Sequence, residues 1–268
     1  MINALEERVL LAMSVVLEKA TLKIQGSERS NEINVEMAAS QVQVTIDSVG
    51  FTIPAGKVKK ISINGARGND RITVANSIRV SVDIFGGMGN DYVRGGVRPT
   101  RFFGELGNDT LAGGQASDLF SGGPGIDTVD YSSRARGLRI TLDGKPNDGE
   151  IPRLGQPAEN DNVTADVENI IGGAGDDYIV GNGLANTLIG GAGGDTLIGQ
   201  AGNDVLVGGP GADLLQGGAG DDVLLGIDQS AGDILNGNAG FDSASLDSVL
   251  GVRDRLLSVE CEASVLGE

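Results

Sequence analysis

The hydrophobic residues of this chain follow two different periods. Over residues 21–85 aliphatic and polar residues alternate, as in TLKIQG at 21–26 and KKISING at 59–65, which is typical of strands that bury one face. In two later stretches an aliphatic residue instead recurs at every ninth position, between runs rich in glycine. So short a period leaves room for strands of only about three residues, which are stable only when they stack on others. We therefore predict an all-β chain in which an N-terminal β region at 21–85 precedes stacked repeats.

The first array of nine-residue units occupies residues 86–130. Glycine opens the units at Gly86, Gly104, Gly113 and Gly122, and aspartate follows at place six as Asp91, Asp109, Asp118 and Asp127. The unit at 95–103 keeps the register but carries Thr100 at place six. A segment at 65–73, GARGNDRIT, fits the same template out of phase, so Asp70 is expected to lack an in-phase neighbour.

The second array, at 172–245, is stricter. Six consecutive units begin with glycine and carry Ile or Leu at place eight, and place six holds Asp177, Asn186, Asp195, Asp204, Asp213 and Asp222. After an insertion of two residues, two further units bring Asp233 and Asp242 to place six. Agreement at several places over six units indicates a repeat protein with a thin, linear core.

The remaining segments lack the repeat. Residues 1–20 are predicted to be a leader or a capping helix, and their apolar stretch at 9–17 is too short to span a bilayer, so no transmembrane segment is expected. Residues 131–171 contain Pro146, Pro152 and Pro157 and are predicted to form an excursion of loops and strands. Residues 246–268 have no glycine array and are predicted to cap the open end of the solenoid.

The nine-residue unit has a physical interpretation. Glycine at places one, two and four permits positive φ and close backbone approach, so that carbonyl groups can point toward one spot. Two units form one coil of eighteen residues with a turn on each edge, and stacked coils lie about 4.8 Å apart. The gap between turns eighteen residues apart is then lined by carbonyl oxygens and by two place-six side chains. Such an oxygen-only site suits calcium better than magnesium, and transition metals are disfavoured because the units contain no imidazole or thiolate.

The charge distribution supports a cation-binding array. The chain has a net charge of −17, and residues 154–252 contain 15 acidic residues and no basic ones. A folded segment of this kind repels itself unless cations intervene, and nucleic acid is excluded as a partner on the same ground.

The unit GGxGxDxUx, with U aliphatic, resembles the RTX or hemolysin-type calcium-binding repeat. The resemblance covers the arrays at 86–130 and 172–245 and implies a right-handed parallel β-solenoid, the RTX β-roll, that is secreted and folds around several calcium ions. It also implies that backbone carbonyls join pairs of place-six residues as ligands. The pairs are Asp91–Asp109, Asp109–Asp127, Asp177–Asp195, Asp195–Asp213, Asp213–Asp233, Asn186–Asp204, Asp204–Asp222 and Asp222–Asp242, while Thr100 leaves Asp118 with a poor partner.

We therefore predict a calcium-binding, non-catalytic protein located outside the cell or at its surface. The chain contains no histidine, which excludes HExxH zinc proteases and Ser-His catalysis. Three alternatives stay open. The aspartates could serve only as turn formers. The 131–171 excursion could make the protein an adhesion or carbohydrate-binding module, whose partner would be a surface polysaccharide or a cell-envelope component. A polysaccharide-modifying enzyme could instead use a cluster of Arg94, Arg98, Arg101, Arg134, Arg136 and Arg139.

Overall fold

The computed structural model describes residues 13–154, 158–226, 232–247, 255–258 and 264–266. Within them the regular structure is strand, apart from one 3-10 turn at Ala55–Lys57. No helix of the described residues is long and apolar enough to cross a membrane. The chain divides into two compact units, Met1–Thr128 and Val129–Glu268.

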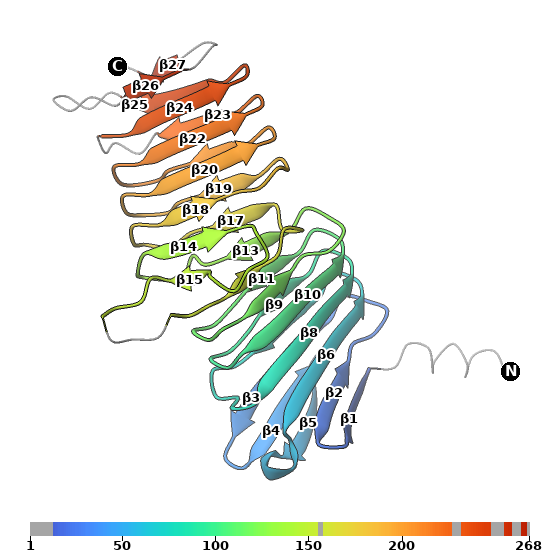
Figure 1. Ribbon diagram of the computed structural model, residues 1–268. Helices are drawn as coiled ribbons and strands as arrows, with labels where there is room; N and C mark the ends of the chain where they lie inside the picture. The colour runs from blue at the N-terminus through green and yellow to red at the C-terminus, as the bar shows by residue number, and fades with distance from the viewer. Residues whose placement is uncertain (1–12, 155–157, 227–231, 248–254, 259–263, 267–268) are drawn as a thin grey trace, which may run out of the picture. The chain divides into compact units, whose positions relative to one another are not determined.

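The first unit contains two sheets built mainly from parallel strands (Figure 1). One has the order β1-β2-β6-β8-β10-β12 and the other β11-β9-β7-β3-β4-β5. The strands are β1 (Ser14–Glu18), β2 (Thr21–Gln25), β3 (Glu32–Ala38), β4 (Gln41–Ile46), β5 (Val49–Pro54), β6 (Lys60–Arg67), β7 (Arg71–Val74), β8 (Ser81–Met88), β9 (Tyr92–Arg94), β10 (Thr100–Leu106), β11 (Thr110–Ala112) and β12 (Leu119–Ser121). Three antiparallel pairings depart from the parallel arrangement: β1 with β2, β3 with β4, and β4 with β5.

Alternation along these strands produces the core as predicted, because every second side chain faces inward. Ile61 and Ile63 are buried on β6, and Ile84 and Phe102 continue the same inward rows on β8 and β10. Phe102 also stacks on Phe120, with ring centroids 4.9 Å apart.

Two features of the first unit differ from the sequence-based expectation. Residues 1–12 of the predicted leader or helix lie outside the described residues, but Ser14–Glu18 of the same segment form strand β1. Strand β5 at Val49–Pro54 was not anticipated. Both strands extend a neighbour through an antiparallel hairpin, and neither contains a fully buried residue, so their apolar pattern is weaker than that of the strands beside them.

The second unit is a parallel β-solenoid. Its sheets have the orders β27-β25-β23-β21-β19-β17 and β15-β14-β18-β20-β22-β24-β26, and Figure 1 shows their short strands stacked as rungs. The strands are β13 (Thr128–Asp130), β14 (Leu138–Thr141), β15 (Gly149–Glu150), β16 (Asn162–Val163), β17 (Asn169–Ile171), β18 (Tyr178–Val180), β19 (Thr187–Ile189), β20 (Thr196–Ala201), β21 (Val205–Val207), β22 (Leu214–Ala219), β23 (Val223–Gly226), β24 (Ile234–Ala239), β25 (Ser243–Asp247), β26 (Arg255–Leu257) and β27 (Ser264–Leu266).

The core of the solenoid is one residue deep. The place-eight side chains are fully buried and stack in register from coil to coil, as Ile179, Leu197 and Leu215 do on successive rungs of one sheet. Of the predicted cap at 246–268, residues 248–254, 259–263 and 267–268 lie outside the described residues. Strands β26 and β27 pair in parallel with β24 and β25.

Candidate metal site

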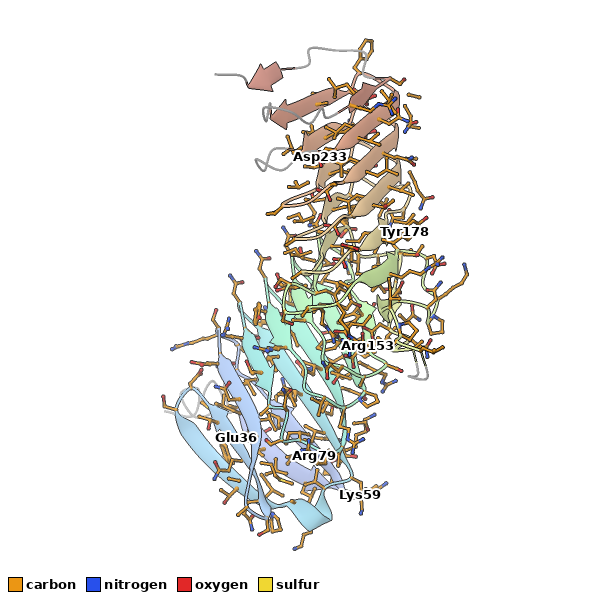
Figure 2. The ribbon with its side chains drawn as sticks, turned by 90° about the vertical axis from the view of Figure 1, so that its left-hand side faces the viewer. Glu36, Lys59, Arg79, Arg153, Tyr178 and Asp233 are labelled. Carbon is orange, nitrogen blue, oxygen red and sulfur yellow. The ribbon has the colours of Figure 1, made fainter. Side chains whose placement is uncertain are left out.

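The twelve predicted metal-site residues are buried at the turns between rungs. Each is at most 3% exposed, although eleven of them are aspartates. Asp233 and Tyr178, both labelled in Figure 2, illustrate the contrast: Asp233 is fully buried, whereas Tyr178 is 38% exposed. A buried carboxylate must find hydrogen bonds or a counter-charge, so its partners decide what the turns can bind.

One oxygen of each carboxylate is used to stack the coils. The backbone N–H of Asp91 donates to Oδ1 of Asp109 at 2.7 Å, and that of Asp204 donates to Oδ1 of Asp222 at 2.8 Å. The same bond joins the other predicted pairs, namely Asp109–Asp127, Asp177–Asp195, Asp195–Asp213, Asp213–Asp233, Asn186–Asp204 and Asp222–Asp242. The structure therefore brings together the side chains that the spacing paired, including those across the two-residue insertion.

The carboxylate folds back over the glycine at place one of its own turn. A Cβ placed on Gly190 would overlap Oδ2 of Asp195, and one placed on Gly104 would overlap both Oδ2 of Asp109 and the carbonyl oxygen of Gly122. Oxygens from two successive coils thus converge beside the place-one Cα. Glycine is required there because any side chain would occupy the space in which these oxygens meet.

The second carboxylate oxygen has no hydrogen-bond partner in seven of the turns that the structure describes. These atoms are Oδ2 of Asp70, Asp91, Asp109, Asp195, Asp204, Asp222 and Asp242. The ion pairs found in the described residues do not include any of these aspartates. Because burying an unpaired charge is costly, these oxygens are suited to a bound cation.

Burial changes the proton affinity of these groups. It raises the pKa of Asp70 and Asp109 to about 7 and that of Asp195 and Asp204 to about 6, although backbone N–H donors oppose the effect. Neighbouring carboxylates, such as Asp91 and Asp127 beside Asp109, raise the pKa further. A bound cation would act in the opposite direction, because it favours the ionised form.

The available donor set fits calcium. Each gap between stacked turns offers two place-six side chains and backbone carbonyl oxygens, and calcium accepts six to eight such ligands in flexible geometry. No group of three or more His, Cys, Asp or Glu side chains suited to a metal occurs in the described residues. The remaining ligands would therefore have to be carbonyls or water.

Not every turn leaves its carboxylate available. In four turns, which we term latched, the place-two N–H donates to the place-six side chain of the same turn at 2.6–3.0 Å. The latched pairs are Ser27–Asn31, Gly114–Asp118, Gly173–Asp177 and Asn182–Asn186. Protein groups have taken the place-six oxygens that a cation would need in these turns.

The seven turns with an unbonded Oδ2, which we term open, have a different backbone. The place-two residue has a positive φ in each of them, even where it is Ala66, Glu105, Gln200 or Asn238. The place-two residues of the latched turns do not have a positive φ. Two distinct turn conformations therefore separate carboxylates that a cation can reach from those already bonded to the chain.

Latched turns occur where the preceding coil supplies no aspartate or asparagine at place six. Asp118 follows Thr100, whose N–H donates to its Oδ1 at 2.8 Å, and Asp177 receives the same bond from Leu138 at 2.7 Å. Asn186 donates through Nδ2 to the carbonyl of Glu168. Among the predicted site residues, Asp177 and Asn186 thus begin a ladder, by which we mean a row of N–H to Oδ1 bonds between place-six residues of successive coils.

The expectation that Asp70 lacks an in-phase neighbour is wrong. Its N–H donates to Oδ1 of Asp91 at 2.7 Å, and its own Oδ1 accepts from the N–H of Asn31 at 2.6 Å. Asn31 and Asp70 are thus two place-six residues that counting in nines did not place in the ladder. The GARGND motif was the available signal, but three extra residues hid its phase.

The arginines considered for an enzymatic face are largely occupied. Arg101 forms an ion pair with Asp83, and Arg134 pairs with Glu159 at 2.8 Å and with Glu150 at 3.7 Å. Arg136 also pairs with Glu150. Arg139 lies over the ring of Tyr178, with 5.5 Å between its Cζ atom and the ring centroid. These contacts use the guanidinium groups within the protein.

Comparison with known families agrees with the turn geometry. The model of the RTX calcium-binding nonapeptide repeat matches residues 83–97, 100–129, 163–197, 180–215 and 198–226. A search of curated proteins gives no match to this chain. With the parallel rungs and the oxygen-lined turns, the match shows that this chain contains RTX calcium-binding nonapeptide repeats in both of its arrays.

Proposed function

We propose that the protein is a non-catalytic calcium-binding β-roll that acts outside the cell and whose repeats fold around calcium. The observation that carries the proposal is the row of buried aspartates whose Oδ2 atoms have no hydrogen-bond partner. The repeats supply oxygen ligands from successive coils but no basic residue between positions 154 and 252. Cations of the calcium class complete such a site.

Calcium binding and folding are linked in this arrangement. The stacked turns exist only in the folded solenoid, so the free energy of calcium binding contributes directly to folding. Without calcium, each open turn would bury a carboxylate with no counter-charge, at an effective cost of several kcal/mol per ion. The second unit concentrates these turns in an acidic segment, so we expect it to depend on calcium most strongly.

An extracellular location follows from the same linkage. A repeat stabilised by bound calcium folds where calcium is abundant, and extracellular modules bind it with dissociation constants of about 10⁻⁴–10⁻³ M. The chain has a single cysteine and so cannot form an internal disulfide. Calcium would take over the role that disulfides have in many secreted proteins.

A non-catalytic role is supported by the chemistry of the side chains. The chain contains no histidine, and the arginines nearest to the excursion are held by Glu150, Glu159 and Tyr178. The turns offer oxygens to a cation rather than a nucleophile and a base to a substrate.

Far-UV circular dichroism of the full chain tests the proposal. Millimolar calcium should produce a β spectrum, and exhaustive chelation should remove a large part of it. Magnesium at the same concentration is the control and should restore little of the signal. A spectrum that is unchanged by chelation, together with no calcium bound at equilibrium, would refute the proposed function.

A further inference from the structure

The first unit contains a gap between stacked turns of which only one turn lies within the residues matched by the repeat family. It is bounded by the turn at 65–70 and the turn at 86–91, and it brings Asp70 next to Asp91. The two aspartates are 21 residues apart rather than 18, which is why a strict count does not pair them.

The sheet register explains how two turns 21 residues apart can still stack. Ala66 pairs with Gly87 and Arg67 with Met88 in parallel between β6 and β8, so the two turns are aligned. Val82 pairs with Thr100 between β8 and β10. Val82 follows Asp70 by twelve residues, whereas its partner Thr100 follows Asp91 by only nine. The three extra residues lie on the opposite edge of the coil, and the turn at 65–70 is unaffected.

The oxygens in this gap have the arrangement found in the matched repeats. Asp70 and Asp91 are each 2% exposed, and the Oδ2 atom of each is buried without a hydrogen-bond partner. A Cβ on Gly65 would overlap both Oδ2 of Asp70 and the carbonyl oxygen of Gly86. A carboxylate oxygen from one coil and a carbonyl oxygen from the next thus converge on one spot.

Both turns that bound the gap are open. Ala66 and Gly87 at place two have φ values of 84° and 114°. The non-glycine residue Ala66 therefore adopts the left-handed conformation, at a cost of roughly 1–2 kcal/mol. The same conformation occurs at place two wherever the carboxylate is left unbonded, as at Glu105 before Asp109.

The nearby guanidinium groups are used elsewhere. Arg67 pairs with Glu28 at 2.8 Å, and the Cζ atom of Arg71 lies 4.3 Å from the centroid of the Tyr92 ring. On the other side of Asp70 the ladder ends at Asn31, where Ser27 latches the turn and the Asn31 carboxamide donates to Asp47 at 2.5 Å. Asn31 thus ends the ladder with protein hydrogen bonds.

We propose that the gap between Asp70 and Asp91 binds a divalent, oxygen-preferring cation of the calcium class. The cation array of the first unit would then begin one coil before the matched repeats and include three gaps: Asp70–Asp91, Asp91–Asp109 and Asp109–Asp127. The proposal rests on the proposed function but makes a separate claim, because the turn that carries Asp70 lies outside the matched residues and 21 residues, not 18, separate Asp70 from Asp91.

Counting bound calcium tests the site. The full chain and its Asp70→Asn variant are dialysed to equilibrium against saturating calcium, and bound metal and protein are measured. The variant should bind one ion fewer per chain. Asp143→Asn, which makes the same change at an exposed loop paired with Lys145, is the control and should bind as many ions as the unmodified chain.

A second variant helps to distinguish loss of the cation site from loss of the folded structure. Ala66→Gly removes the conformational strain but leaves every oxygen in place, so it should keep the full ion count. If Asp70→Asn does not fold, a crystal structure of the unmodified chain grown with calcium decides the question through the electron density between Asp70 and Asp91.

The outcomes distinguish the two proposals. If the unmodified chain binds no calcium, the proposed function fails. If it binds calcium and Asp70→Asn folds with the same ion count, only the additional site is refuted. A crystal structure with ions in the matched gaps and none beside Asp70 would likewise overturn this inference alone.

Discussion

The backbone N–H of Asp204 donates to Oδ1 of Asp222, one coil further along the chain, at 2.8 Å. One oxygen of each carboxylate thus stacks the coils, and in the open turns the other oxygen has no hydrogen-bond partner. Coil stacking and cation binding depend on the same side chain, which is why we expect folding and calcium binding to occur together.

Removing a carboxylate from an open turn should weaken the calcium-dependent transition. Asp204→Asn keeps the shape of the side chain and its Oδ1 acceptor but removes a charge. Loss of a group that only supports a metal ligand typically lowers metal affinity by roughly 10–100-fold. We therefore expect the calcium concentration at the midpoint of the circular dichroism transition to rise by at least that factor. Asp221→Asn, at the exposed neighbouring position, should shift it far less, and equal shifts would contradict a ligand role for Asp204.

The calcium-free protein should become less stable as pH rises. Burial raises the pKa of Asp70 and Asp109 to about 7 and of Asp195 and Asp204 to about 6, above the usual 3.8. The folded state thus binds more protons than the unfolded state between about pH 4 and 7, and the free energy of unfolding falls through this window. Urea unfolding of metal-stripped protein at pH 5 and pH 8 measures the effect.

Calcium should reverse this pH dependence. The ion binds the ionised carboxylates and so competes with protons, and its affinity should fall as pH drops from 7 to 5. Calcium titrations at the two pH values supply the comparison. An affinity that did not change over this range would show that the carboxylates with raised pKa are not ligands.

Replacing Ala66 by glycine should stabilise the first unit. Ala66 has a φ of 84°, and removing its Cβ relieves roughly 1–2 kcal/mol of strain while adding about 0.5–1 kcal/mol of backbone entropy cost. We therefore expect a net gain of up to about 1.5 kcal/mol in the free energy of unfolding at saturating calcium. Ala192→Gly, at a residue without a positive φ, should be destabilising instead.

Arg134 should be essential to the stability of the second unit. Its side chain is 4% exposed and pairs with Glu159 and Glu150, which are themselves buried. Arg134→Ala would remove the buried guanidinium that pairs with both carboxylates, at an expected cost of about 3–5 kcal/mol. Arg139→Ala removes a contact with the Tyr178 ring, for which about 0.5–1 kcal/mol is expected. Denaturant unfolding in calcium compares the two variants.

Much of the solenoid and its turns was predictable from the sequence because their signals are local and repeated. A glycine, an aspartate and an aliphatic residue at places one, six and eight set the turn, the ladder and the core within each unit. Pairs such as Asp195–Asp213 follow from the eighteen-residue coil alone. The match at 83–129 and the ladder bonds around Asp109 show that the same logic holds in the first array.

The sequence could not determine which turns are latched and which are open. Asp177 and Asp195 occupy the same place in equivalent units. The Asp177 turn is latched by the N–H of Gly173, whereas Oδ2 of Asp195 has no hydrogen-bond partner. The difference arises from the preceding coil, which places Leu138 under Asp177 and Asp177 under Asp195. The phase of Asp70 likewise depends on where three extra residues are accommodated, and only the pairings of β7 with β9 and of β8 with β10 show that they lie on the opposite edge. The repeat therefore determined the chemistry of each turn. Stacking of coils, which joins residues far apart in the chain, determined which carboxylates remain available for a cation.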